Sequence, residues 1–79
     1  MGDRFPIPSY RELTKAAKKL GFSFFRQAKS SHEIWRRESD GKQTTIPNYG
    51  RKAIKRKTLK AILGDFGIHW KKFRELSNE

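Results

Sequence analysis

His32 is the side chain of this sequence best suited to acid–base chemistry. Histidine is the residue type whose ordinary pKa lies near neutrality, and His32 directly follows a short polar segment, Lys29-Ser30-Ser31. RNA can be cut without a metal when a base removes the 2′-hydroxyl proton and cations stabilise the charge on the phosphate. We therefore interpret His32 as a candidate general base or acid. The candidate phosphate ligands around it are Arg26, Lys29, Ser31 and Arg36.

One histidine does not complete this reaction. A second group must protonate the leaving oxygen, and the sequence offers Ser31, Tyr49 or a lysine for that role. A histidine in a strand is also commonly structural. The sequence alone does not choose among these alternatives.

The charge of the chain is strongly positive and unevenly distributed. Nineteen Lys and Arg against eight Asp and Glu give a net charge of +11, and all the acids lie outside residues 42–63. A block of one sign indicates a site for a polyanion, which is bound more weakly as salt rises. Nucleic acid and an acidic protein are the partners that such a surface fits. The cations of this block are Lys42, Arg51, Lys52, Lys55, Arg56, Lys57 and Lys60, of which we select Lys55 and Lys57 as candidate RNA ligands.

Several function classes are excluded by length and composition. The 79 residues fit one domain, residues 1–79, and are too few for a dinucleotide-binding enzyme. No Cys is present and the two histidines, at 32 and 69, lack metal-ligand spacing, so we expect no metal and no small-molecule cofactor. No segment approaches the roughly 20 apolar residues of a membrane helix. The first residues lack the apolar core of a signal peptide, so we expect a cytoplasmic protein without a membrane partner.

Helical periodicity appears near both ends of the chain. Ser9 and Glu12 form a capping box, an apolar face follows at i, i+3, i+4, i+7 spacing, and Gly21 is the expected end. Thr58 is the predicted N-cap of a second helix that Gly67 ends. Its N–H groups, with Lys57 beside them, are suited to a phosphate. A short last helix is expected over residues 69–76.

Three strands are expected between these helices. Residues 22–27 are rich in aromatics, residues 32–37 follow a polar turn, and residues 42–46 follow the hairpin signal Asp40-Gly41. Because side chains alternate along residues 32–37, Ile34 and Trp35 face opposite sides of the sheet, and the pattern does not decide which of the two joins the core. The order predicts an α+β fold, α-β-β-β-α with a short C-terminal helix, in which the helices cover one face of a three-stranded antiparallel sheet. Residues 1–8 are expected to be an extended leader and residues 77–79 a frayed tail.

These segments together resemble the HicA toxins, also called the YcfA-like family, from about residue 9 to residue 76. The matching pieces, in order, are Gly21-Phe22-Ser23-Phe24-Phe25-Arg26-Gln27, Ser31-His32, Thr45-Ile46-Pro47, Lys57-Thr58-Leu59-Lys60-Ala61-Ile62-Leu63 and Gly67-Ile68. The resemblance implies a fold like a double-stranded RNA-binding domain. It also implies an mRNA interferase that cuts RNA without a metal and arrests growth, and a HicB antitoxin that covers the active site.

The family's Gly-Ser-His motif falls on Ser30-Ser31-His32, so the resemblance makes His32 catalytic. The sequence departs from the family at two positions. Ser30 stands at the motif glycine, which matters if that position requires a positive φ. Asn48 and Tyr49 follow Pro47, where many members carry a second histidine.

Two further hypotheses remain open at this stage. A non-catalytic RNA-binding module of the same fold would bind RNA in a salt-dependent way without cutting it. An interaction protein would use the basic face only to dock an acidic partner such as a HicB-like protein. Many basic α+β domains bind RNA without acting on it, so fold and charge alone do not separate these readings.

Overall fold

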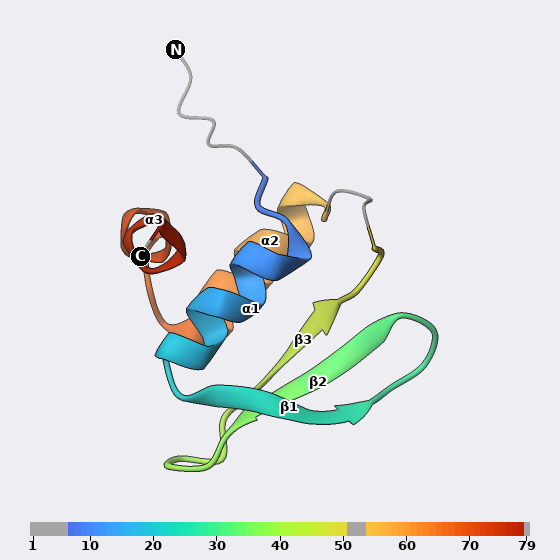
Figure 1. Cartoon of the computed structure of the whole chain (residues 1–79). Helices are drawn as coiled ribbons and strands as arrows, with labels where there is room; N and C mark the ends of the chain where they lie inside the picture. The colour runs from blue at the N-terminus through green and yellow to red at the C-terminus, as the bar shows by residue number, and fades with distance from the viewer. Residues whose placement is uncertain (1–6, 51–53, 79) are drawn as a thin grey trace.

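The computed structural model describes residues 7–50 and 54–78 and has the expected α+β architecture. Residues 1–6 of the predicted leader, Arg51 and Lys52 of the basic block, and residue 79 lie outside the described residues. Figure 1 shows helices α1 and α2 on one side of the sheet, with α3 beside α1. The elements are α1 (Tyr10–Lys19), β1 (Phe22–Gln27), β2 (His32–Arg37), β3 (Gln43–Pro47), α2 (Arg56–Phe66) and α3 (Trp70–Asn78).

The first helix begins and ends as its sequence predicts. The Ser9 hydroxyl accepts a hydrogen bond from the Glu12 backbone N–H, and the Glu12 carboxylate accepts one from the Ser9 N–H, which completes the capping box. Gly21, with φ of +92°, turns the chain from α1 into β1. A Cβ at Gly21 would lie 3.2 Å from the Arg37 side chain, so this close contact and the positive φ both favour glycine.

The sheet is a three-stranded antiparallel meander in the order β1-β2-β3. The helices cover the face that carries Trp35, which is 3% exposed, and Ile34 lies on the other face. Trp35 is therefore the residue of this pair that joins the core. Strand β3 runs over Gln43–Pro47, one residue later than predicted. Pro47 is compatible with its last position because β3 is an edge strand.

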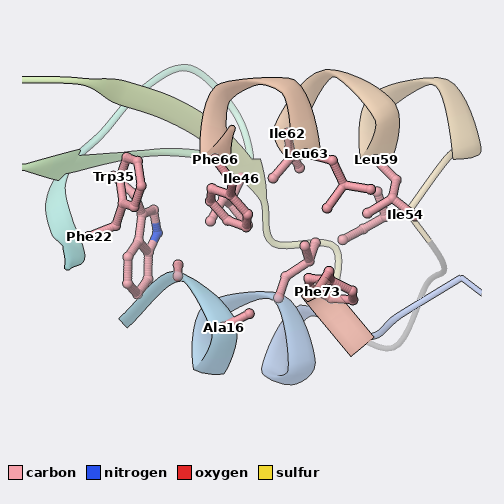
Figure 2. Close-up of a cluster of buried hydrophobic side chains, with 12 residues drawn as sticks. Ala16, Phe22, Trp35, Ile46, Ile54, Leu59, Ile62, Leu63, Phe66 and Phe73 are labelled. Atoms are coloured by element: carbon pink, nitrogen blue, oxygen red, sulfur yellow. The ribbon is translucent and has the colours of Figure 1, made fainter. Parts of the chain in front are cut away.

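Helix α2 begins earlier than the sequence predicted. Lys55, not Thr58, is its N-cap, and no side chain caps it. The buried residues Ile54 and Leu59 occupy the N′ and N4 positions, and Figure 2 shows them together at one end of the core. This is the arrangement of a hydrophobic staple, which fixes where the chain enters a helix. Gly67, with φ of +74°, ends α2 as expected.

The core is a single cluster between the helices and the sheet (Figure 2). Phe22 and Trp35 lie at one end, while Phe73 of α3 closes the space beside α1. Helix α3 runs to Asn78, so it includes two of the three terminal residues that we expected to fray. Among the described residues, no helix has the length and apolar character needed to cross a membrane.

Glu33 places a carboxylate inside this cluster, with 7% of its surface exposed. Its Oε1 accepts hydrogen bonds from the Tyr10 hydroxyl at 2.6 Å and the Trp35 indole N–H at 3.0 Å, and its Oε2 accepts one from the Asn48 amide at 3.2 Å. Burial raises the pKa of Glu33, but the three hydrogen bonds outweigh burial and the net pKa is lowered. Burial, together with the hydrogen bond to Glu33 and its charge, raises the pKa of Tyr10 to about 12. Glu33 thereby connects α1, β2 and the segment after β3.

We expect Glu33→Gln to lower the free energy of unfolding at neutral pH by about 1–2 kcal/mol, because an amide N–H would face the Asn48 amide. Glu33→Ala should cost more, since it leaves all three donors without their acceptor. The contribution of the wild-type carboxylate is fully present above its ordinary pKa of 4.5 and is lost as pH falls through its lowered folded pKa. Urea unfolding of wild type and Glu33→Gln should therefore show a stability gap that narrows below pH 4.5. A gap that stays constant down to pH 3 would contradict this account.

Candidate functional site

His32 lies at the first position of β2, where a four-residue turn returns the chain from β1. The His32 N–H donates to the Lys29 carbonyl at 3.1 Å, and the Ala28 N–H donates to the His32 carbonyl at 2.8 Å. The Gln27 side-chain amide donates to the carbonyls of His32 at 2.9 Å and Ser30 at 3.1 Å. These bonds hold the backbone on both sides of His32, while its half-buried imidazole lies on the sheet face opposite Glu33.

Ser30, the residue at the motif glycine, has a positive φ of +59°. It is the one non-glycine residue of the described ranges in this left-handed region. An L-residue pays roughly 1–2 kcal/mol for that conformation, and glycine adopts it freely. The position therefore does require the backbone geometry that a glycine would satisfy, two residues before His32.

Tyr49 lies beside His32 from the segment after β3. The two ring centroids are 6.5 Å apart with an interplanar angle of 67°, an edge-on contact. The Asn48 N–H donates to the Ser31 carbonyl at 2.8 Å, and the Gly50 N–H donates to the Asn48 side chain at 3.2 Å. Through Asn48, this segment is also bound to the buried Glu33. Tyr49 is 37% exposed, so its ring is held against His32 but reachable from outside.

A groove of about 420 Å³ opens beside His32, between β3 and α2. The first turn of α2 contributes Lys57 and Thr58 to its wall, and Asp65 lies two turns further along the helix. Asp65 accepts a hydrogen bond from the Thr44 hydroxyl at 2.9 Å, which connects the helix to β3. The lining residues are His32, Thr45, Pro47, Lys57, Thr58, Ala61, Ile62 and Asp65.

The basic end of this groove suits an anion. Lys55, Arg56 and Lys57 begin α2, and its first turn contains no acidic residue. The helix dipole is already positive there, so cations at this end lower the stability of the helix unless an anion is bound. The arrangement can thus hold a phosphate near the α2 N-terminus and present it to an imidazole.

The residues selected from the sequence lie in four places. His32 and Lys57 share the groove. Arg26 and Arg36 lie on the outer sheet face, where Arg26 pairs in register with Ile34 and Arg36 with Ser23. Lys29 and Ser31 belong to the turn before His32, and Lys55, at the α2 N-cap, is exposed and does not line the groove.

Sequence reasoning missed the residues that support the site. The side chains of Gln27, Glu33 and Asn48 position His32 and Tyr49, and Asp65 adds an acid to the groove that holds Lys57. Gln27 could have been selected from the sequence, because it belongs to one of the segments that resemble the HicA toxins. Glu33 looked like an ordinary strand residue, and its role depends on Tyr10, which lies 23 positions away in the sequence.

Comparison with known families gives one match that includes this entire site. The family model for the HicA toxin of bacterial toxin–antitoxin systems matches residues 10–68, from the start of α1 to the residue after Gly67. A comparison with curated proteins gives no match.

Replacing Ser30 with glycine should relieve the left-handed strain. The gain of roughly 1–2 kcal/mol is partly offset by the greater freedom of glycine in the unfolded chain, so we expect a net stabilisation of about 0.5–1 kcal/mol. Thermal and urea unfolding would measure it. Ser39→Gly, at an exposed serine outside the left-handed region, is the matched control and should bring no gain. Equal effects of the two substitutions would contradict the strain at Ser30.

Proposed function

The chain belongs to the HicA toxin family, and on this premise we propose that it is a metal-independent endoribonuclease that cuts mRNA and is paired with a HicB-like antitoxin. The observation that supports this function best is the position of His32. Its ring lies at a groove whose other wall is the basic N-terminal turn of α2. The acid–base group of β2 and the anion-binding turn of α2 thus come from different elements and line the same groove.

The proposed reaction begins with a phosphate bound near Lys57. His32 takes the proton of the 2′-hydroxyl, and the 2′-oxygen forms a bond to phosphorus. The bond from phosphorus to the 5′-oxygen breaks, and a second group protonates that oxygen. The products are a 2′,3′-cyclic phosphate and a 5′-hydroxyl end. Cations near the phosphate stabilise the additional negative charge of the transition state.

Tyr49 is our choice for the second group among the three candidates. Ser31 is held in the turn by its carbonyl, whereas the Tyr49 ring directly contacts His32 and is accessible. A phenol carries a proton at neutral pH and can donate it. Tyr49 would then act from the segment in which many family members carry their second histidine.

We propose that the antitoxin is acidic where it contacts this chain. The net charge of +11 and the cations that begin α2 attract a negative protein surface as well as RNA. An antitoxin bound over the groove would exclude the substrate from His32, so RNA and antitoxin would compete.

A non-catalytic RNA-binding module is the second candidate function. Asp65 in the groove favours it over cleavage, because a carboxylate there opposes the additional negative charge that the phosphate develops in the transition state. This alternative predicts RNA binding without cleavage and no role for His32.

The first test incubates purified protein with a long RNA in EDTA and resolves the products on a gel. We expect cleavage that His32→Ala reduces by about 10²–10⁴-fold, the usual contribution of an acid–base group. His69→Ala, at the exposed histidine beside α3, is the matched control and should cleave like wild type. RNA binding without cleavage by the wild type would instead establish the binding module.

A second test separates the ring of Tyr49 from its hydroxyl. Tyr49→Phe keeps the ring against His32 and removes the proton donor, so we expect cleavage to fall by at least about 10²-fold while RNA affinity is unchanged. Tyr49→Ala should lose both cleavage and part of the affinity. If Tyr49→Phe cleaves at the wild-type rate, the phenol is not the acid.

A further inference from the structure

The outer face of the sheet carries a second cluster suited to RNA, away from the groove. His32, Ile34 and Arg36 lie on this face of β2, opposite the face that bears Glu33 and Trp35. The helices leave the outer face uncovered (Figure 1). Arg36 lies four positions after His32, a distance of about 13 Å at the usual rise per residue.

A β-bulge brings an aromatic ring to Arg36. The register of β1 against β2 passes from Phe24↔Trp35 to Arg26↔Ile34, which leaves Phe25 as the extra residue. A bulge lets two consecutive side chains oppose one residue of the partner strand. Phe25 consequently reaches Arg36, whose guanidinium carbon lies 5.2 Å from the ring centroid, and Phe25 remains 45% exposed.

The same sheet contains a structural Arg–Phe pair for comparison. Arg37 lies 4.7 Å from the ring of Phe22, which is 1% exposed. Its guanidinium also donates to both carboxylate oxygens of Asp40, at 3.0 and 2.9 Å, and to the Leu20 carbonyl at 3.2 Å. The ring is covered and the cation is neutralised, so this pair serves the fold.

In the Phe25–Arg36 pair the ring is half exposed, and Glu38 does not come within hydrogen-bond distance of the guanidinium. The nearest approach of Glu38 to Arg36 is 3.9 Å at Nε, beyond hydrogen-bond distance, and within the described ranges this buried Nε–H has no hydrogen-bond partner. The contact with Glu38 is thus a long ion pair to an exposed carboxylate, which neutralises Arg36 less than Asp40 neutralises Arg37. A half-exposed ring beside such a cation is suited to single-stranded nucleic acid, because it can stack a base and hold its phosphate.

We propose that Phe25 and Arg36 form a stacking subsite for one base of a single-stranded RNA that crosses the outer sheet face toward His32. This inference rests on the proposed function, since it identifies single-stranded RNA as the substrate form. Arg26 is the next residue along β1 and pairs in register with Ile34, so it lies between this subsite and His32. In this proposal, Arg26 would contact the RNA backbone that connects the two. Stacking is tolerant of sequence, so the subsite selects an unpaired base rather than a particular one.

The test measures the affinity of a labelled single-stranded RNA by fluorescence anisotropy, in a His32→Ala background so that the probe stays intact. Phe25→Leu keeps an apolar side chain without a stacking face and should weaken binding by about 5- to 100-fold. Phe25→Trp should retain wild-type affinity. Arg36→Gln should weaken binding and reduce the salt dependence by about one phosphate contact.

Phe24→Leu is the matched control. Phe24 is slightly more exposed than Phe25, at 51%, but it contacts Trp35 on the helix-facing side, with ring centroids 6.3 Å apart. Its substitution should leave RNA affinity unchanged. A fully paired RNA of the same length should bind Phe25→Leu and the His32→Ala parent equally, because its bases are already stacked. Thermal unfolding of each variant confirms that the fold is retained.

The outcomes separate this subsite from the proposed function. If wild type cuts RNA and Phe25→Leu loses no affinity for single strands, the subsite is wrong and the function stands. The subsite would also be overturned if Phe25→Leu and Phe24→Leu lost RNA affinity equally. The same holds if Phe25→Leu lost affinity equally for single-stranded and fully paired RNA. If the protein neither binds nor cuts RNA, both proposals fail.

Discussion

The carboxylate of Glu33 is the constraint on which the arrangement of this small protein depends. A buried charge requires hydrogen bonds that compensate for lost hydration, and Glu33 obtains them from a helix, a strand and a loop. The donors are neutral, so the negative charge is shared among dipoles rather than cancelled by a cation. Glu33 adjoins His32 and its partner Asn48 adjoins Tyr49, so the same network that holds the fold together also brings the two rings into contact.

The local order of elements was readable from the sequence because each boundary has a strong chemical signal. Gly21, Gly67 and the Ser9 capping box mark helix ends, and the strands β1 and β2 have the predicted bounds. The predicted start of α2 is wrong. Thr58 is a good capping residue, but the helix begins earlier because the apolar residue Ile54 anchors its start in the core. Ile54 is buried, and a helix that began at Thr58 would lose the staple with Leu59.

The site was only partly predictable, because its supports act over long sequence separations. Alternation placed His32 and Arg36 on one face but did not say which face the helices cover. That choice follows from the large ring of Trp35, which the helices bury, and from Glu33 on the same face, which accepts a hydrogen bond from Tyr10 of α1. The groove was not foreseen, since it forms between β3 and α2 and brings Lys57 to His32 while leaving Lys55 outside. A positive φ at Ser30 was foreseen as a condition of the motif and is present.

The bulge at Phe25 also bears on how this chain meets copies of itself. β1 is an edge strand with unpaired backbone groups and two exposed phenylalanines, the type of edge that invites strand-to-strand aggregation. A bulge interrupts the regular spacing of those groups and increases the local twist, so a second edge cannot continue the ladder along the whole strand. The irregularity thus makes β1 a poorer template for strand-to-strand aggregation while its aromatic side chains stay exposed.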